Sequence, residues 1–97
     1  MDFEKIISSP TPVLIDFYAD WCEPCKWLEP VLDDLQKRLN NKIAIHKIDI
    51  EKFPDLRLRN QIMSVPVLML FKDGKLLWRM NGFLYAKDLA EKIKKFI

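Results

Sequence analysis

The chain has 97 residues, 49% of them hydrophobic, and its 16 basic and 14 acidic residues leave a formal net charge of only +2. This length and composition suffice for one hydrophobic core, so we expect a single domain over residues 1–97. The basic residues are scattered, which argues against a nucleic-acid partner. The longest apolar run, Val65–Phe71, is interrupted by Pro66 and is far too short to span a membrane.

The segment Met1–Lys5 contains acids where a secretory signal would have a basic region followed by a long apolar stretch. We therefore expect a cytoplasmic protein, provided that no leader has been removed. The two cysteines, Cys22 and Cys25, are too few for the disulfide scaffold of a small secreted protein and stand three positions apart. Their spacing suggests chemistry rather than structural cross-linking.

In chain order, the first strongly patterned segment is Pro12–Tyr18, which is apolar on both alternating faces except at Asp16 and therefore predicts a central strand. Leucines then recur at spacings of four, three and four residues, which predicts an amphipathic helix over roughly Cys22–Leu39. Ile43–Ile50 is a second predicted strand. Because a helix separates the two strands, the right-handed crossover rule makes them parallel.

A short helix is predicted over Pro54–Asn60. The segments Val65–Phe71 and Lys75–Met80 then flank Lys72-Asp73-Gly74, whose Asp-Gly pair is a strong signal for an antiparallel hairpin. The last segment, Ala86–Phe96, has acids first and lysines last, which suits the dipole of a helix. Helices and strands in this order predict the α/β class with a mixed sheet.

The segment Cys22-Glu23-Pro24-Cys25 lies where the first strand ends and the long helix begins. A thiol at the positive end of a helix, in a Cys-X-X-Cys pair, has its pKa lowered from about 8.5 toward neutrality. Cys22 is therefore the predicted attacking thiol, and Cys25, one turn further, is expected to be more buried and to resolve the mixed disulfide. The alternatives are two inert thiols or a zinc half-site, for which His46 is the remaining soft ligand.

The run from Asp16 to Lys26, followed by Ser64-Val65-Pro66 and Lys72-Asp73-Gly74, resembles the thioredoxin family. The resemblance extends from about Val13 to the end of the chain. It implies a thioredoxin-like fold, a central mixed four-stranded sheet with helices on both faces, and the activity of a protein disulfide reductase. It also implies disulfide-containing client proteins as partners, with electrons supplied through an NADPH-dependent flavoenzyme, thioredoxin reductase. No bound cofactor or metal is expected beside the Cys22–Cys25 pair.

The same resemblance gives roles to Asp16 and Lys47. In the family the matching acid accepts, through water, the proton of the cysteine that corresponds to Cys25, and the matching lysine lies beside that acid. Independently, Asp16 shares a strand face with Leu14 and Tyr18, so burial should raise its pKa. The alternatives are a carboxylate solvated at a sheet edge and, for Lys47, an ordinary surface lysine.

A surface for an extended peptide is implied as well. Val65-Pro66 matches the family's cis-proline element, which offers backbone groups to the substrate, and Gly82 matches the glycine of the facing loop. The alternatives are an ordinary trans Pro66 in an edge strand and a core role for Trp21. The residues expected on this surface are Trp21, Glu23, Pro24, Met63, Val65, Pro66, Gly82 and Phe83.

Two departures from the family pattern carry predictions. Glu23 stands where the family most often has glycine, and we expect a modestly higher Cys22 pKa than in Glu23→Gly, because a carboxylate opposes the thiolate. Only about eleven residues precede the first strand, where typical members have another strand and a full helix. With one short helix from Phe3, Ile6 and Ile7, the sheet should have four strands and Ile43–Ile50 should be an exposed edge.

Tyr85 precedes the last helix where a Ser or Asp cap is expected, and the sequence offers no reason for it. We expect a monomer, with the exposed edge as the pairing surface of any dimer. Two other functions use the same pattern: a disulfide oxidant or isomerase in an oxidising compartment, and a non-catalytic binding module whose dithiol is incidental. Measurement of the reduction potential distinguishes an oxidant or isomerase from a reductase, because reductases have lower potentials. Biological activity that survives replacement of both cysteines would indicate the binding module.

Overall fold

A computed structural model describes residues 1–97 and contains one mixed sheet, whose strands lie in the order β2-β1-β3-β4. Strands β1 and β2 are parallel, whereas β3 is antiparallel to both β1 and β4. The four strands are β1 (Val13–Tyr18), β2 (Ala44–Asp49), β3 (Val67–Lys72) and β4 (Lys75–Asn81). The predicted α/β class, the parallel pair and the position of β2 at an exposed edge are confirmed.

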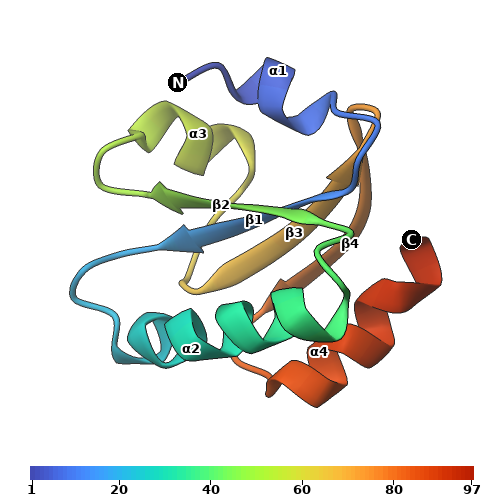
Figure 1. Cartoon of the computed structure of the whole chain (residues 1–97). Coiled ribbons are helices and arrows are strands. Elements are labelled where there is room, and N and C mark those ends of the chain that lie inside the picture. Colours follow the sequence, from blue (N-terminus) through green and yellow to red (C-terminus); the bar gives the residue numbers. More distant parts are fainter.

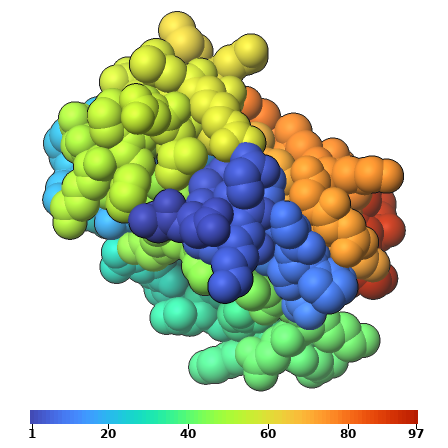
Figure 2. Space-filling model, turned by 90° about the horizontal axis from the view of Figure 1, so that it is seen from above, coloured from blue at the N-terminus to red at the C-terminus, as the bar shows by residue number.

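Helices cover both faces of the sheet, as Figure 1 shows: α2 and α4 lie on one face, and α1 and α3 on the other. Seen from above, the chain start and the segment around α3 lie side by side over the second face (Figure 2). No helix is both long enough and apolar enough to cross a membrane. The helices are α1 (Phe3–Ile7), α2 (Glu23–Arg38), α3 (Pro54–Arg59) and α4 (Ala86–Ile93), and a 3₁₀ turn follows over Lys94–Phe96.

The two central strands are buried on both faces, which explains their nearly continuous apolar sequences. Every residue of Val13–Phe17 and of Val67–Phe71 is buried, whereas the edge strands β2 and β4 consist largely of half-buried and exposed residues. Strand β3 begins two residues later than predicted. Pro66 has no N–H to donate to a ladder, so regular pairing starts at Val67.

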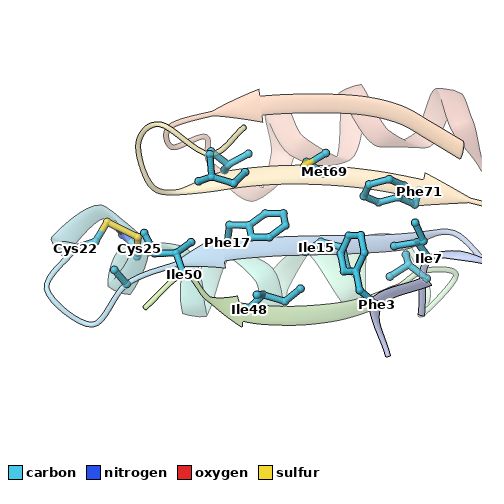
Figure 3. Packing of buried hydrophobic residues seen from close by; sticks show 14 residues of the cluster. Phe3, Ile7, Ile15, Phe17, Cys22, Cys25, Ile48, Ile50, Met69 and Phe71 are labelled. Carbon is cyan, nitrogen blue, oxygen red and sulfur yellow. Dashed lines mark hydrogen bonds between the residues drawn. A yellow bond between two sulfur atoms is a disulfide. The ribbon is translucent and has the colours of Figure 1, made fainter. Parts of the chain in front are cut away.

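The sheet separates two apolar clusters. A leucine-rich cluster fills the space between the sheet and helices α2 and α4. The other cluster lies toward α1 and α3, and Figure 3 shows it running from Phe3 and Ile7 at one end to Cys22 and Cys25 at the other. The cysteine pair therefore belongs to a packed core while standing at its very end.

The loop of the β3–β4 hairpin also holds the start of the chain. Asp73 and Gly74 have the positive φ values, 51° and 80°, that the Asp-Gly signal requires. The Asp73 N–H donates to the carbonyl of Ser9 at 3.0 Å, and the Gly74 N–H donates to that of Ile7 at 2.8 Å. Helix α1 is thus tied to the end of the sheet that lies away from the cysteines.

Candidate active site

Cys22 and Cys25 are joined by a disulfide at the point where the chain leaves β1 and enters α2, with their Cα atoms 5.3 Å apart. Cys22 is the N-cap of α2, and its sulfur accepts a hydrogen bond from the Cys25 N–H at 3.3 Å. The first N–H groups of a helix lack partners within the helix and carry partial positive charge. When the disulfide is reduced, this position favours an anionic sulfur on Cys22.

The prediction that Cys25 is more buried than Cys22 is wrong, because the two residues are almost equally buried. Cys22 is 4% exposed and Cys25 is 3% exposed. Both belong to the same apolar cluster, and the disulfide draws both sulfurs to its end (Figure 3). Their surroundings do differ, because Cys25 lines a pocket of about 110 Å³ together with Tyr18 and Glu29, and Cys22 does not.

Asp16 is fully buried, at 0% exposure, and neither of its carboxylate oxygens has a hydrogen-bond partner. Burial raises its pKa from 3.8 to about 6; the nearby charge of Lys47 opposes this rise, and that of Glu29 adds to it. The predicted burial and the predicted direction of the pKa change are confirmed. A carboxylate of this kind can take up and release a proton near neutral pH.

Lys47 lies directly opposite Asp16 in the β1–β2 register, as the predicted role requires. Its ammonium group, however, donates a hydrogen bond of 2.7 Å to Glu29 on α2 and lies 4.6 Å from the centre of the Tyr18 ring. This hydrogen bond and the charge of Lys47 lower the pKa of Glu29. Sequence reasoning missed Glu29, although its place four residues after Cys25 on a helix was a usable signal.

The Val65–Pro66 peptide bond is cis, as the resemblance implied. Val65 is half-buried against the cluster that holds both cysteines, and Pro66 is buried. The Gly82 N–H donates to the Pro66 carbonyl at 2.9 Å, and Gly82 has φ near 105°, a conformation that favours glycine. The predicted proline and glycine elements are therefore in contact.

The other residues predicted for the peptide surface are accessible to different degrees. Trp21 is 66% exposed and Met63 is 86% exposed, while Pro24 and Phe83 are half-buried. The Trp21 indole N–H donates to Glu51 at 2.9 Å, so the ring is fixed at the surface, and a core role for it is excluded. Exposed side chains of this size offer apolar area for a partner to cover.

Two sets of side-chain contacts near the site were not predicted from the sequence. Glu23 is exposed and forms an ion pair with Lys26 at 3.2 Å. Tyr85, which provides no side-chain cap for α4, packs edge-to-face on Phe83 at a centroid distance of 5.0 Å, and Phe83 packs likewise on Trp27 at 6.2 Å. An aromatic contact thus accounts for the missing cap residue.

No group of three or more His, Cys, Asp and Glu side chains is arranged to hold a metal ion. The site instead consists of a cysteine pair that forms a disulfide at a helix N-terminus, a buried acid and a neighbouring cis-proline. Fold and site together define a thiol–disulfide oxidoreductase.

The comparisons with known proteins agree. The Thioredoxin family model matches residues 1–95. The chain is 40% identical over 94 residues to the thioredoxin-like protein slr0233 of Synechocystis, covering 97% of this chain and 90% of that protein. The structure of a mutant thioredoxin from Halobacterium salinarum superposes with a TM-score of 0.87 at 34% identity, covering 98% of this chain and 82% of the other. The chain belongs to the thioredoxin family and has the thioredoxin fold.

The chain is also 47% identical over 87 residues to the chloroplastic thioredoxin Y2 of Arabidopsis thaliana. That match covers 90% of this chain but only 52% of the plant protein, so the chain spans about half the length of this relative. As a member of the family with an intact cysteine pair, the chain is an enzyme of thiol–disulfide exchange that acts as a protein disulfide reductase.

Proposed function

We propose that Cys22 is the attacking thiolate and Cys25 the resolving thiol in the reduction of disulfides in client proteins. The observation that carries this assignment is the position of Cys22 at the N-cap of α2, where its sulfur accepts a hydrogen bond from the Cys25 N–H in the first turn of the helix. A thiolate is the nucleophile in disulfide exchange, so the sulfur at the helix start attacks first.

In the first step the Cys22 thiolate attacks one sulfur of the client disulfide. The S–S bond of the client breaks and a Cys22–client disulfide forms. The other client sulfur leaves as a thiolate, which takes up a proton. In the second step Cys25 gives up its proton and attacks the Cys22 sulfur, which releases the second client thiolate. Two electrons pass to the client, and the enzyme is left with the Cys22–Cys25 disulfide.

Asp16 is the proposed acceptor of the Cys25 proton in the second step. Its buried, unpartnered carboxylate has a pKa of about 6 and is largely ionised at neutral pH, where it can act as a base. Lys47, opposite Asp16 on β2, keeps positive charge close to the carboxylate while it is ionised.

Clients are proposed to lie as extended peptides on the surface around Trp21, Met63, Val65 and Phe83, with the Val65 backbone pairing with the peptide. The oxidised enzyme then needs a source of two electrons, which we propose is an NADPH-dependent flavoenzyme of the thioredoxin reductase type.

The cytoplasm is the proposed compartment, because a reductase needs surroundings that keep thiols reduced. A fluorescent fusion tests the location, and accumulation in a plastid would contradict it.

An insulin turbidity assay tests the activity, first with dithiothreitol and then with a candidate reductase and NADPH. We expect precipitation of reduced insulin in both cases. With Cys22→Ser, dithiothreitol should give only the slow precipitation seen without enzyme, and the reductase with NADPH should give none. A reduction potential well above about −230 mV would instead indicate an oxidant or isomerase. Biological activity that survives loss of both cysteines would indicate a binding module.

A further inference from the structure

Lys47 stands between two carboxylates and is bonded to only one of them. Its Nζ donates to Glu29 Oε1 at 2.7 Å, while both oxygens of Asp16 remain without a partner. The register of β1 and β2 nevertheless sets Asp16 and Lys47 side by side. The lysine therefore makes its hydrogen bond with the acid at the surface and not with the buried acid next to it.

One further contact helps to fix this arrangement. Lys47 Nζ lies 4.6 Å from the centre of the Tyr18 ring, so the ammonium group is held between that ring and Glu29. Burial lowers the pKa of Lys47, but the hydrogen bond and charge of Glu29, then the charges of Asp16 and Tyr18, outweigh it and raise the pKa. Lys47 thus stays cationic throughout the physiological range.

Glu29 also lines a pocket beside Cys25. It lies four residues beyond Cys25 on α2, and both residues line the pocket of about 110 Å³ near Tyr18. This volume has room for about three water molecules. The residue that holds Lys47 therefore lines the same pocket as the resolving cysteine.

A direct bond from Lys47 to Asp16 would stabilise the ionised carboxylate and make it a weaker base. We propose that Glu29 is a positioning residue that holds the Lys47 ammonium away from Asp16, leaving the buried carboxylate free to exchange a proton during the resolving step. This proposal rests on the proposed role of Asp16 as proton acceptor. Glu29 does not itself touch the reacting sulfurs.

The groups whose charge bears on Asp16 are few. Strand β3 offers the apolar Leu68 opposite Asp16, and the buried residues of α4 are also apolar. The charges that act on the Asp16 carboxyl are those of Lys47 on β2 and Glu29 on α2, while Cys25 and Tyr18 line the pocket that Glu29 also lines.

The test is Glu29→Gln, with the Asp16 carboxyl followed by carbon-13 NMR and the rate of mixed-disulfide resolution measured against pH. We expect the released lysine to bond to Asp16, so that the Asp16 midpoint and the acid limb of the rate profile both move to lower pH by about half a pH unit. Asp33→Asn is the matched control. It removes the same charge one turn further along α2 from an acid without an ion pair, and it should move neither quantity by a comparable amount.

A double-mutant cycle decides whether Glu29 acts through Lys47. In a Lys47→Gln background, Glu29→Gln should move the Asp16 midpoint clearly less than it does in the original background, because only the direct effect of the Glu29 charge on Asp16 is then left. An equal shift with and without Lys47, or no shift beyond that control in the original background, would overturn the proposal. Asp16→Asn separates the two hypotheses: if it leaves the acid limb in place, the role of Asp16 fails, whatever Glu29 does.

Discussion

The two sides of the Cys22–Cys25 disulfide are built from opposite kinds of residue. On one side, Trp21 and Met63 expose large apolar side chains to solvent. On the other, Asp16 is buried without a hydrogen-bond partner beneath the Lys47–Glu29 pair. The first side can bind a client and the second can move a proton, and no residue is common to both. Substitutions should therefore affect binding and proton transfer separately.

The largest effect is expected at the cysteines, on which both sides depend. Cys22→Ser should reduce disulfide reduction to the rate of the uncatalysed reaction, because the nucleophile is lost. Cys25→Ser should instead trap a mixed disulfide, which non-reducing electrophoresis and intact mass spectrometry detect. A trapped client in Cys22→Ser and none in Cys25→Ser would reverse the assigned roles.

The next effect is the pH dependence of stability caused by Asp16. Its pKa is 3.8 ordinarily and about 6 in the folded protein, so between these values the folded state keeps a proton that the unfolded state has lost. The contribution of Asp16 to the free energy of unfolding is therefore neutral below pH 4, falls as the pH rises, and is unfavourable by about 3 kcal/mol above pH 6.

Asp16→Asn should remove this penalty. Urea unfolding of the oxidised protein should show a gain of up to about 3 kcal/mol at pH 7 and a much smaller one at pH 4. The same variant should slow the resolving step while leaving the KM for insulin unchanged. An equal change in stability at both pH values would show that ionisation of the buried acid is not the cause.

A smaller effect tests the apolar side. Met63→Ala should raise the KM for insulin about five- to tenfold, because the side chain loses apolar area that a client would cover. Reduction of a small disulfide reagent should be unaffected. Leu76→Ala provides the control, since Leu76 is also an exposed apolar residue but lies by the β3–β4 hairpin, at the other end of the sheet. Equal losses in both variants would disprove a local binding surface.

The smallest effect is expected from Glu23, which lies between the two sides. Its carboxylate is exposed and paired with Lys26, so its influence on Cys22 is screened. In Glu23→Gly, the pH midpoint for alkylation of Cys22 by iodoacetamide should fall by a few tenths of a pH unit. Glu23→Gln separates charge from backbone flexibility and should give the same change. No change, or a rise, would contradict the prediction.

The sequence was sufficient where short-range patterns determine structure. The leucine spacing of α2, the Asp-Gly turn and the two buried strands led to correct elements, with boundaries displaced by one or two residues. The raised pKa of Asp16 was also predictable, because an acid in a strand apolar on both faces has nowhere to be solvated.

Contacts between distant segments were not predictable in this way. The choice of Lys47 between Asp16 and Glu29 depends on how α2 sits over the edge of the sheet, which no local pattern describes. The near-equal burial of Cys22 and Cys25 depends on how the start of α2 packs against residues from distant parts of the chain. The position of Tyr85 likewise makes sense only when Phe83 is seen beside it.

The hydrogen bonds from the hairpin loop to the start of the chain make the first residues a necessary part of the folded domain. Helix α1 has only five residues and could not persist alone in water, so these bonds and the packing of Phe3 and Ile7 keep it in place. A chain begun at Pro10 would leave two amide protons of the loop without acceptors and would open Phe71 to water. The first nine residues therefore cover the apolar core at the end of the sheet farthest from the cysteine pair.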